Sequence, residues 1–220
     1  MSPNSTTRFV DNIYRQFPGQ SVAFLDETYR GFERPGEAPF YVFTAVVVKA
    51  DDMEPIRKEL LDIAGGTYWH TSDCLKTPDG RARAKEMLAY LMEGVEPILI
   101  AKKVAVERAD STLEGARRVC FRRLAVALTS GVEGVCAPVN LVVMERRNTA
   151  ALHKIDARTF ADLHSEGAIP RVSRLVQASP NDDRLLWLPD VVSSAVRRSI
   201  AFGDDGMYDI VKEGVHFMTA

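Results

Sequence analysis

The sequence predicts a single mixed α/β domain, and three observations lead to this prediction. Two apolar runs, at 21–26 and 40–48, lie close together in the chain, and the second is apolar on both faces, as in a buried strand. Further strand-like runs then alternate with helical patterns, which is typical of a sheet with helices packed on its faces. The length of 220 residues, with 46% hydrophobic and 26% charged, is ordinary for a globular chain of one large or two small domains.

The first two strands are expected to form an antiparallel hairpin near the centre of the sheet. Only about 13 residues, 27–39, join them, which is too short for a parallel crossover that contains a helix. The turn residues of "RGFERPGEAP" in this connection support the same pairing.

The other elements follow from periodicity and from turn residues. Helices are predicted at 51–64, 80–93, 112–130 and 149–165, and a last helix within 179–201, with Asn181 or Asp182 as its cap. Strands are predicted at 97–106, 138–147 and 170–178, and a short one at 68–70. The expected organisation is an N-terminal arm at 1–20, a domain at 21–202 and a C-terminal tail at 203–220.

Composition excludes several classes of function. The formal net charge of -2 gives no global positive field, so any contact with nucleic acid needs a local patch. The three cysteines are widely spaced and odd in number, which predicts reduced thiols in a cytoplasmic protein and no disulfide framework. No apolar stretch approaches membrane-spanning length, so no membrane partner is expected.

Acidic residues stand at the ends of three apolar segments. Asp26 and Glu27 end the first strand in "SVAFLDETYRGF", Glu145 follows "LVVM", and Asp190 lies within "LLWLPDVV". A carboxylate in apolar surroundings is costly unless it is paired or binds a metal. Hard cations such as Mg²⁺ bind carboxylate oxygens, and two such ions about 4 Å apart can promote phosphodiester cleavage.

Each acid also has a structural explanation. Asp26 can close a strand before a turn. Glu145 can pair with Arg146 or Arg147. Asp190 can be a first-turn acid of a helix that begins at Pro189, where the helix dipole favours it.

Several segments together resemble one uncharacterised prokaryotic family. These are "FLDET", "YVFTAVVV", "YWHTSD", "LVVMERR" and "RLLWLPDVVSSAVRR". They resemble domain-of-unknown-function family 3800 over about residues 21–200. The resemblance implies a ribonuclease-H-like mixed sheet with helices on both faces. It also implies an acidic cluster of Asp26 and Asp190, with Glu27 beside the first and with His70 and Asp73 as further members.

The sequence departs from the family pattern in three places. Thr28 and Tyr29 replace Ser-Gly after the first acids, and Pro189 replaces the alanine before Asp190. Met144 stands where many relatives carry Asp, which leaves the acid, Glu145, one residue later. Because adjacent strand residues face opposite ways, Glu145 is expected to reach the cluster through the strand's end or a bulge.

The expected function is that of a nuclease or related phosphoryl-transfer enzyme, a phosphodiester hydrolase that acts on nucleic acid and depends on Mg²⁺ or Mn²⁺. Its predicted metal ligands are Asp26, Glu145 and Asp190, and the predicted catalytic set adds Glu27, His70 and Asp73. Arg197 and Arg198 are the expected nucleic-acid contacts.

The alternative is a non-catalytic ribonuclease-H-like module that binds protein or nucleic acid in a mobile-element or defence system, and Met144 favours it. A protein partner or a homodimer is compatible with either function.

Two further expectations concern structure. Trp187 is expected in the core, and the arginines of the helix at 112–130 are expected on a solvated face, with Glu114 paired to Arg118. These arginines are Arg117, Arg118, Arg122 and Arg123.

Overall fold

The computed structural model describes residues 10, 12–32, 37–94, 96–103 and 106–219. Its described residues form one six-stranded sheet in the order β5-β4-β1-β2-β3-β6. The strands are β1 (Val22–Arg30), β2 (Phe40–Val48), β3 (Ile98–Lys103), β4 (Leu141–Glu145), β5 (Arg174–Ala178) and β6 (Val215–Thr219). The pairs β1–β2 and β2–β3 are antiparallel, whereas β1–β4, β4–β5 and β3–β6 are parallel. The sheet is therefore mixed, as predicted.

The predicted hairpin is confirmed. β1 pairs with β2 along its whole length, from Val22 opposite Val48 to Arg30 opposite Phe40. β1 lies inside the sheet, where β4 and β2 pair with its two edges, and the side chains on its two faces enter two separate apolar cores. This central position explains why the start of β1 is apolar on both faces.

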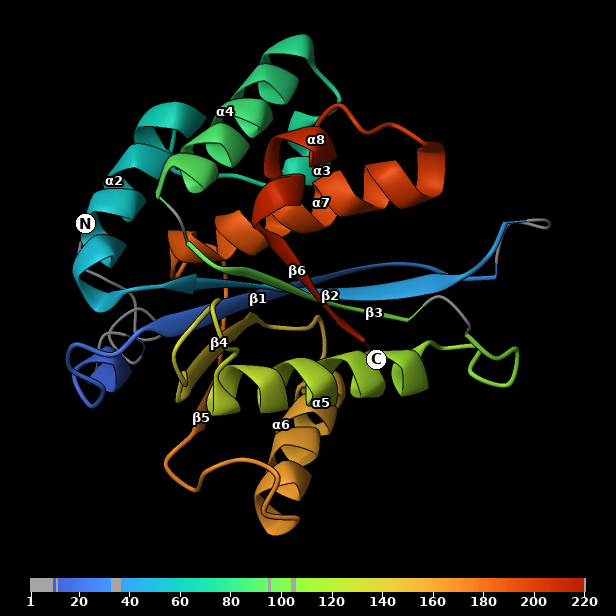
Figure 1. Cartoon of the computed structure of the whole chain (residues 1–220). Helices are drawn as coiled ribbons and strands as arrows, with labels where there is room; N and C mark the ends of the chain where they lie inside the picture. The colour runs from blue at the N-terminus through green and yellow to red at the C-terminus, as the bar shows by residue number, and fades with distance from the viewer. Residues whose placement is uncertain (1–9, 11, 33–36, 95, 104–105, 220) are drawn as a thin grey trace.

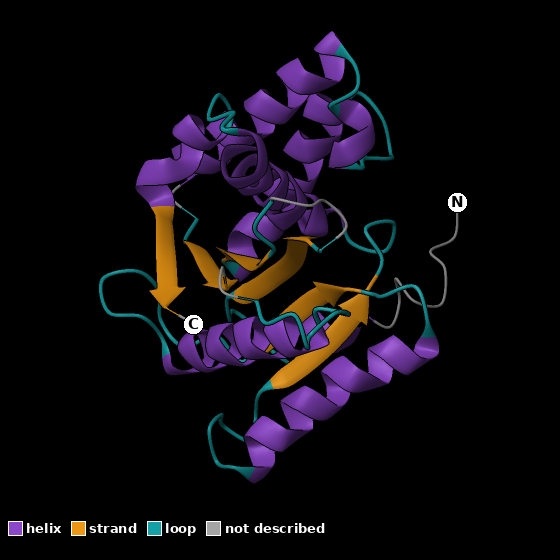
Figure 2. Ribbon diagram, turned by 90° about the vertical axis from the view of Figure 1, so that its right-hand side faces the viewer, coloured by secondary structure: helices purple, strands orange, loops and turns teal. Residues whose placement is uncertain are grey.

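Helices cover both faces of the sheet, as Figure 1 shows with the sheet between an upper and a lower layer. The upper layer contains α2 (Met53–Ala64), α3 (Thr71–Cys74), α4 (Pro78–Gly94), α7 (Trp187–Phe202) and α8 (Tyr208–Val211). The lower layer contains α5 (Glu114–Ser130) and α6 (Ala150–Ser165). Three short 3₁₀ turns complete the described elements, at η1 (Ala50–Asp52), η2 (Arg184–Leu186) and η3 (Lys212–Gly214). In Figure 2 the strands again lie between these two layers.

Each face of the sheet has its own apolar core, and strand alternation decides which residues enter which core. On β1, Val22 and Phe24 pack on the α7 side, whereas Ala23 and Leu25 pack on the α5 side. β4 alternates in the same way, with Val143 on the α7 side and Met144 on the α5 side. Two-residue periodicity then directs the next polar residues of each strand to a defined face.

Two predicted elements need correction. No strand forms at 68–70, because these residues connect the end of α2 at Gly65, in the left-handed conformation, to the start of α3. Asp183 caps the 3₁₀ turn η2, where its Oδ1 accepts a hydrogen bond from the Leu185 amide, whereas α7 follows Leu186 without a side-chain cap. Neither Asn181 nor Asp182 caps α7, because the chain turns once through η2 before α7 begins at Trp187.

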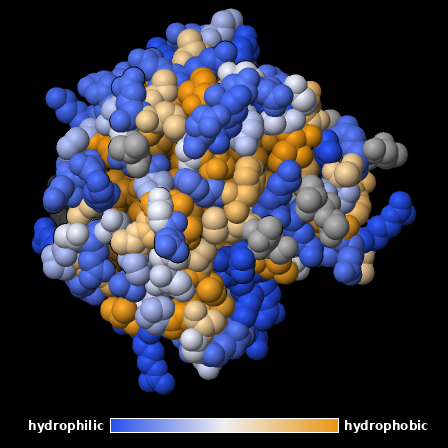
Figure 3. Space-filling model, viewed as in Figure 1, coloured by the Kyte–Doolittle hydropathy of each residue, from blue (hydrophilic) through white to orange (hydrophobic). Residues whose placement is uncertain are grey.

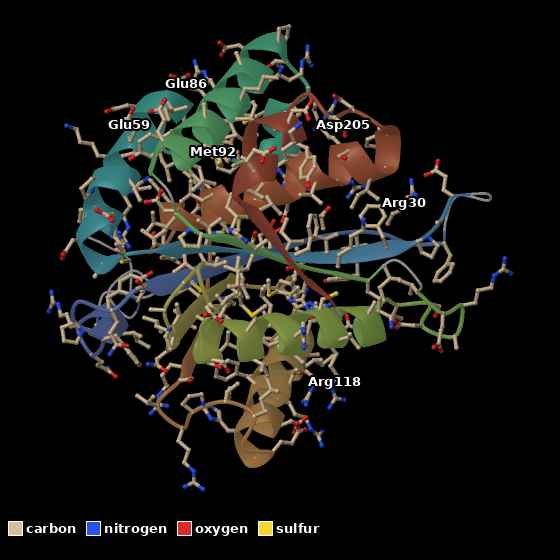
Figure 4. The ribbon with its side chains drawn as sticks, viewed as in Figure 1. Arg30, Glu59, Glu86, Met92, Arg118 and Asp205 are labelled. Atoms are coloured by element: carbon tan, nitrogen blue, oxygen red, sulfur yellow. The ribbon has the colours of Figure 1, made fainter. Side chains whose placement is uncertain are left out.

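The arginines of α5 do not all face solvent, contrary to the prediction. Arg117 is 2% exposed, because the start of α5 packs on the sheet and on α6, and its guanidinium donates to both carboxylate oxygens of Asp156 at 2.9 Å. Arg118 does point outward from α5, as Figure 4 shows, but it pairs with Asp162 and not with Glu114. Glu114 pairs with Arg147 instead.

The remaining surface is ordinary for a globular chain. Figure 3 shows hydrophilic side chains over most of the outer surface of both helical layers on the viewed face. In the described part of the chain, no helix has the length and apolar character needed to cross a bilayer. Trp187 is 1% exposed, which confirms its predicted place in the core.

Candidate active site

Three carboxylates from three elements line one cavity on the α7 face of the sheet. Asp26 lies within β1, Glu145 is the last residue of β4, and Asp190 lies in the first turn of α7. The cavity has a volume of about 430 Å³. The fold thus brings Asp26 together with two acids that lie more than a hundred residues later in the sequence.

Strand register places Asp26 and Glu145 side by side. The parallel pairing of β1 and β4 ends with Leu25 opposite Met144, so the next residue of each strand is an acid. On the other side of β1, Asp26 lies opposite Thr44, whose hydroxyl accepts a hydrogen bond from Ser193 of α7 at 2.9 Å. Asp26 therefore faces the α7 layer, as two-residue alternation from Phe24 requires.

Met144 does not displace the acid from the site. Its side chain is fully buried in the core on the α5 side. Glu145, one residue later, therefore points to the α7 side, which is the side of Asp26. β4 pairs regularly with β5 up to Glu145 opposite Ala178, so of the two expected routes Glu145 uses the end of the strand and not a bulge.

Burial raises the pKa values of all three carboxyl groups, and repulsion by neighbouring acids adds to the rise at Asp26 and Glu145. Asp26 is 9% exposed, and desolvation, followed by the charges of Asp190, Glu27 and Glu145, holds its pKa well above the usual range. Desolvation and the Asp190 charge raise the pKa of Glu145 to about 7. Among the described residues, no lysine or arginine forms an ion pair with Asp26, Glu145 or Asp190.

Asp190 is held by Thr71, which the sequence did not single out. The Thr71 amide and hydroxyl donate to Asp190 Oδ2 at 3.0 and 2.8 Å, and Trp69 Nε1 donates to the same hydroxyl oxygen at 2.8 Å. Desolvation raises the pKa of Asp190, and the two Thr71 hydrogen bonds oppose that rise. Thr71 lies in "YWHTSD", but its contact with α7 spans 119 residues and is not visible in a local pattern.

The secondary members of the predicted set have different places. Glu27 follows Asp26 and turns to the α5 side, where it forms an ion pair with the buried Arg117. Desolvation raises the pKa of Glu27, and the Arg117 charge opposes that rise. His70 lines the cavity beside the acids, and its charge opposes part of the rise in the pKa values of Glu145 and Asp190. Asp73 is half-exposed, pairs with Lys76 and does not line this cavity.

The three acids fit a divalent cation by charge and donor type. Carboxylate oxygens are the ligands that Mg²⁺ and Mn²⁺ prefer, and a cation between them would relieve the repulsion that raises their pKa values. Their placement fits less well. In the described ranges of the chain, no group of three or more His, Cys, Asp or Glu side chains is arranged to hold a metal ion. The three acids therefore have the charge and the donor atoms that a divalent cation needs, but they are not arranged as a set of ligands around one.

Solved structures of ribonucleases H have a fold similar to that of this chain. Bst-RNase HIII in complex with Mn²⁺ is 14% identical with a TM-score of 0.49, and the match covers 90% of this chain. The ribonuclease H2 from Pyrococcus horikoshii OT3 is 12% identical with a TM-score of 0.49, and the match covers 89% of this chain and 81% of that chain. The chain spans 55% of the length of the Bst-RNase HIII chain. No family model and no curated protein sequence matches it.

This likeness concerns the fold alone, so the chemistry of the site depends on the residues described above.

Cationic residues complete the cavity. Arg197 and Arg198 of α7 line it together with the exposed ring of Phe202. Arg198 is held by Asp204, to which its Nε donates at 2.9 Å. Arg197 is exposed and has no ion pair with a described residue.

Proposed function

We propose that the chain is a divalent-metal-dependent nuclease, a phosphodiester hydrolase that acts on nucleic acid. One observation carries the proposal. Asp26, Glu145 and Asp190 come from three elements to one cavity, without an ion pair to a described lysine or arginine, and all three have raised pKa values. Such perturbed carboxyl groups in a cavity are typical of functional sites. Membership of domain-of-unknown-function family 3800 is part of the same proposal.

The three acids would hold Mg²⁺ or Mn²⁺. When bound, the cation supplies positive charge that lowers the pKa of a bound water and stabilises the leaving oxygen. Thr71 keeps Asp190 Oδ2 in place through two hydrogen bonds, so that carboxylate is oriented before the cation arrives. Arg197, which has no described ion-pair partner, binds a substrate phosphate at the α7 side of the cavity.

His70 has a different role from that of the acids. It is half-exposed at the mouth of the cavity, and its Nδ1 lies 3.0 Å from Ser72 Oγ and 3.3 Å from Asp73 Oδ2. The charge of His70 favours the ionised forms of Glu145 and Asp190, because it opposes the rise in their pKa values. We therefore assign it as a positioning residue, and Asp73 as its support.

The second candidate is a non-catalytic module that binds nucleic acid or protein. One observation favours it, namely that no described group of acids is arranged as a metal site. Metal-dependent melting separates the two functions. A metal that binds only the folded state at one hundred times its Kd stabilises the protein by about 2.7 kcal/mol, whereas a module without a site does not respond.

The decisive experiment compares cleavage by the wild type with cleavage by Asp190→Asn. Labelled DNA and RNA oligonucleotides are incubated with Mg²⁺, Mn²⁺ or EDTA, and the products are resolved by size. We expect cleavage that requires the metal and is lost in Asp190→Asn, with folding stability unchanged or slightly raised because repulsion is relieved. Asp209→Asn is the matched control, since Asp209 is exposed on α8 and pairs with Lys212. Cleavage by Asp190→Asn at the wild-type rate would refute the role of the acids.

A further inference from the structure

A second cavity lies on the α5 side of the acid cluster. Its volume is about 360 Å³, and it shares Asp26, Glu27, His70 and Glu145 with the first cavity. The reason lies in the lengths of two strands. β4 ends at Glu145, whereas β1 continues to Arg30, and their pairing stops at Leu25. Beyond this point the β1 edge has no strand partner on the β4 side among the described residues, so the two cavities meet past the end of β4.

An aromatic ring is presented in the second cavity. Tyr29 is 49% exposed and stacks on Tyr41, with ring centroids 5.6 Å apart and an angle of 7° between the ring planes. Tyr41 is buried, and its hydroxyl accepts a hydrogen bond from Arg117 Nη1 at 2.7 Å. Arg117 is itself held by Asp156. The exposed ring of Tyr29 is thus supported from below by a buried, hydrogen-bonded network.

Cationic side chains lie on both sides of the acids. Arg146 follows β4, is exposed, lines the second cavity and donates to the Gln177 carbonyl at 3.3 Å. Arg197 lines the first cavity. The order along the joined cavities is therefore an aromatic ring and a cation, then the acids, then a second cation. A chain with regularly spaced anions and flat apolar groups matches this order.

We propose that the two cavities form one groove for a single strand of nucleic acid, with an unpaired base stacked on Tyr29 and with phosphates at Arg146 and Arg197. The proposal rests on the proposed function for the acids at the centre of the groove. It specifies a single strand because a base in a duplex has both faces covered by its neighbours, whereas an unpaired base offers one face to an aromatic side chain. DNA and RNA strands share this chemistry.

Binding is measured by fluorescence anisotropy with labelled oligonucleotides of about 12 nucleotides, a length within the range that single-strand binding sites contact. All arms use the full chain with Asp190→Asn and EDTA, so that neither the metal nor cleavage enters the result. The arms are single-stranded DNA, single-stranded RNA and the matching DNA duplex, at one low salt concentration because affinity depends on salt. Three further substitutions are added to this background, namely Tyr29→Ala, Tyr29→Phe and Phe217→Ala.

We expect Tyr29→Ala to weaken single-strand binding by about 5- to 150-fold, which is the effect of removing one stacked base contact. Tyr29→Phe keeps the ring and should bind within about twofold of the background. Phe217→Ala is the matched control, because Phe217 is 50% exposed on the edge strand β6, away from the groove. The duplex should bind more weakly than the single strands and should not respond to Tyr29→Ala. The comparison of DNA with RNA shows which backbone the groove accepts.

Three results would overturn the proposal. These are unchanged single-strand binding in Tyr29→Ala, an equal loss for duplex and single strand, or no binding of any single strand. None of these results depends on a metal or on cleavage. A chain that binds single strands through Tyr29 but cleaves nothing would refute the proposed nuclease and retain the groove, so the two failures are distinguishable.

Discussion

Replacing Glu145 by glutamine should stabilise the metal-free protein at pH 8 and leave its stability nearly unchanged at pH 5. The pKa of Glu145 is raised to about 7 in the folded protein, from a usual value of 4.5. Between pH 4.5 and about pH 7, the carboxyl group of Glu145 keeps its proton in the folded state, whereas it has already lost that proton in the unfolded state. Stability contributed by this group therefore falls as the pH rises from 4.5 through 7. Glutamine carries no charge at any pH, so Glu145→Gln removes that fall.

The size of the effect follows from the same pKa. The full difference between folded and unfolded states would be about 3 kcal/mol, since one pKa unit corresponds to about 1.4 kcal/mol. Glu145 is partly exposed, and solvent screening reduces the effect to about 1–2 kcal/mol. For a chain of this length, such a change raises the Tm by about 2–8 °C.

The assay is thermal and urea unfolding of the wild type and Glu145→Gln in EDTA, at pH 5 and pH 8. Glu86→Gln is the control, because Glu86 is exposed on α4 (Figure 4) and lines neither cavity, so its replacement should change stability by less than about 0.5 kcal/mol. Equal stability of wild type and Glu145→Gln at pH 8 would show that the charge of Glu145 does not destabilise the folded protein. An equal gain at both pH values would show the same, because such a gain would not come from the carboxylate charge.

Three further predictions follow from the hydrogen bonds and ion pairs of the site. Thr71→Val should lower the free energy of unfolding in urea by about 1–3 kcal/mol, because Trp69 Nε1 loses its buried acceptor. Thr71→Ser keeps the hydroxyl and should retain most of the wild-type stability. Arg117→Met should cost about 3–5 kcal/mol because it leaves buried acids unpaired, whereas Arg118→Met, at an exposed pair, should cost less than about 1 kcal/mol. His70→Ala should raise the pKa of Glu145 further, as followed by carboxyl NMR titration, and an unchanged or lower value would remove its positioning role.

Much of the fold could be predicted because it depends on local patterns. The apolar run of β2 is buried at every position, and the short connection to β1 permits only an antiparallel pairing. The helical stripes of α2, α5 and α6 also correspond to elements at nearly the predicted bounds. No strand forms at 68–70 because the two glycines before it, Gly65 and Gly66, end α2 and turn the chain. No neighbouring strand in the described sheet is available to pair with these residues.

The candidate site could be predicted only in part. Each of the three acids ends or interrupts an apolar run, and that signal is local. The side to which an acid points is not local, because it depends on register between strands. The pairing of Leu25 with Met144 sets Glu145 beside Asp26, and the same alternation turns Glu27 away toward Arg117. Arg117 itself looked like a surface residue, because its three acidic and phenolic partners lie on other elements.

The position of Mn²⁺ bound to the protein tests most directly whether the three acids form a metal site. Crystals soaked in Mn²⁺ are measured for anomalous scattering, for the wild type and for Asp190→Asn. We expect a peak in the cavity among Asp26, Glu145 and Asp190, with carboxylate oxygens at roughly 2.1–2.2 Å as for small divalent cations, and its loss in Asp190→Asn. A wild-type map with no peak in this cavity, or with Mn²⁺ only at His70 and Asp73, would contradict this expectation.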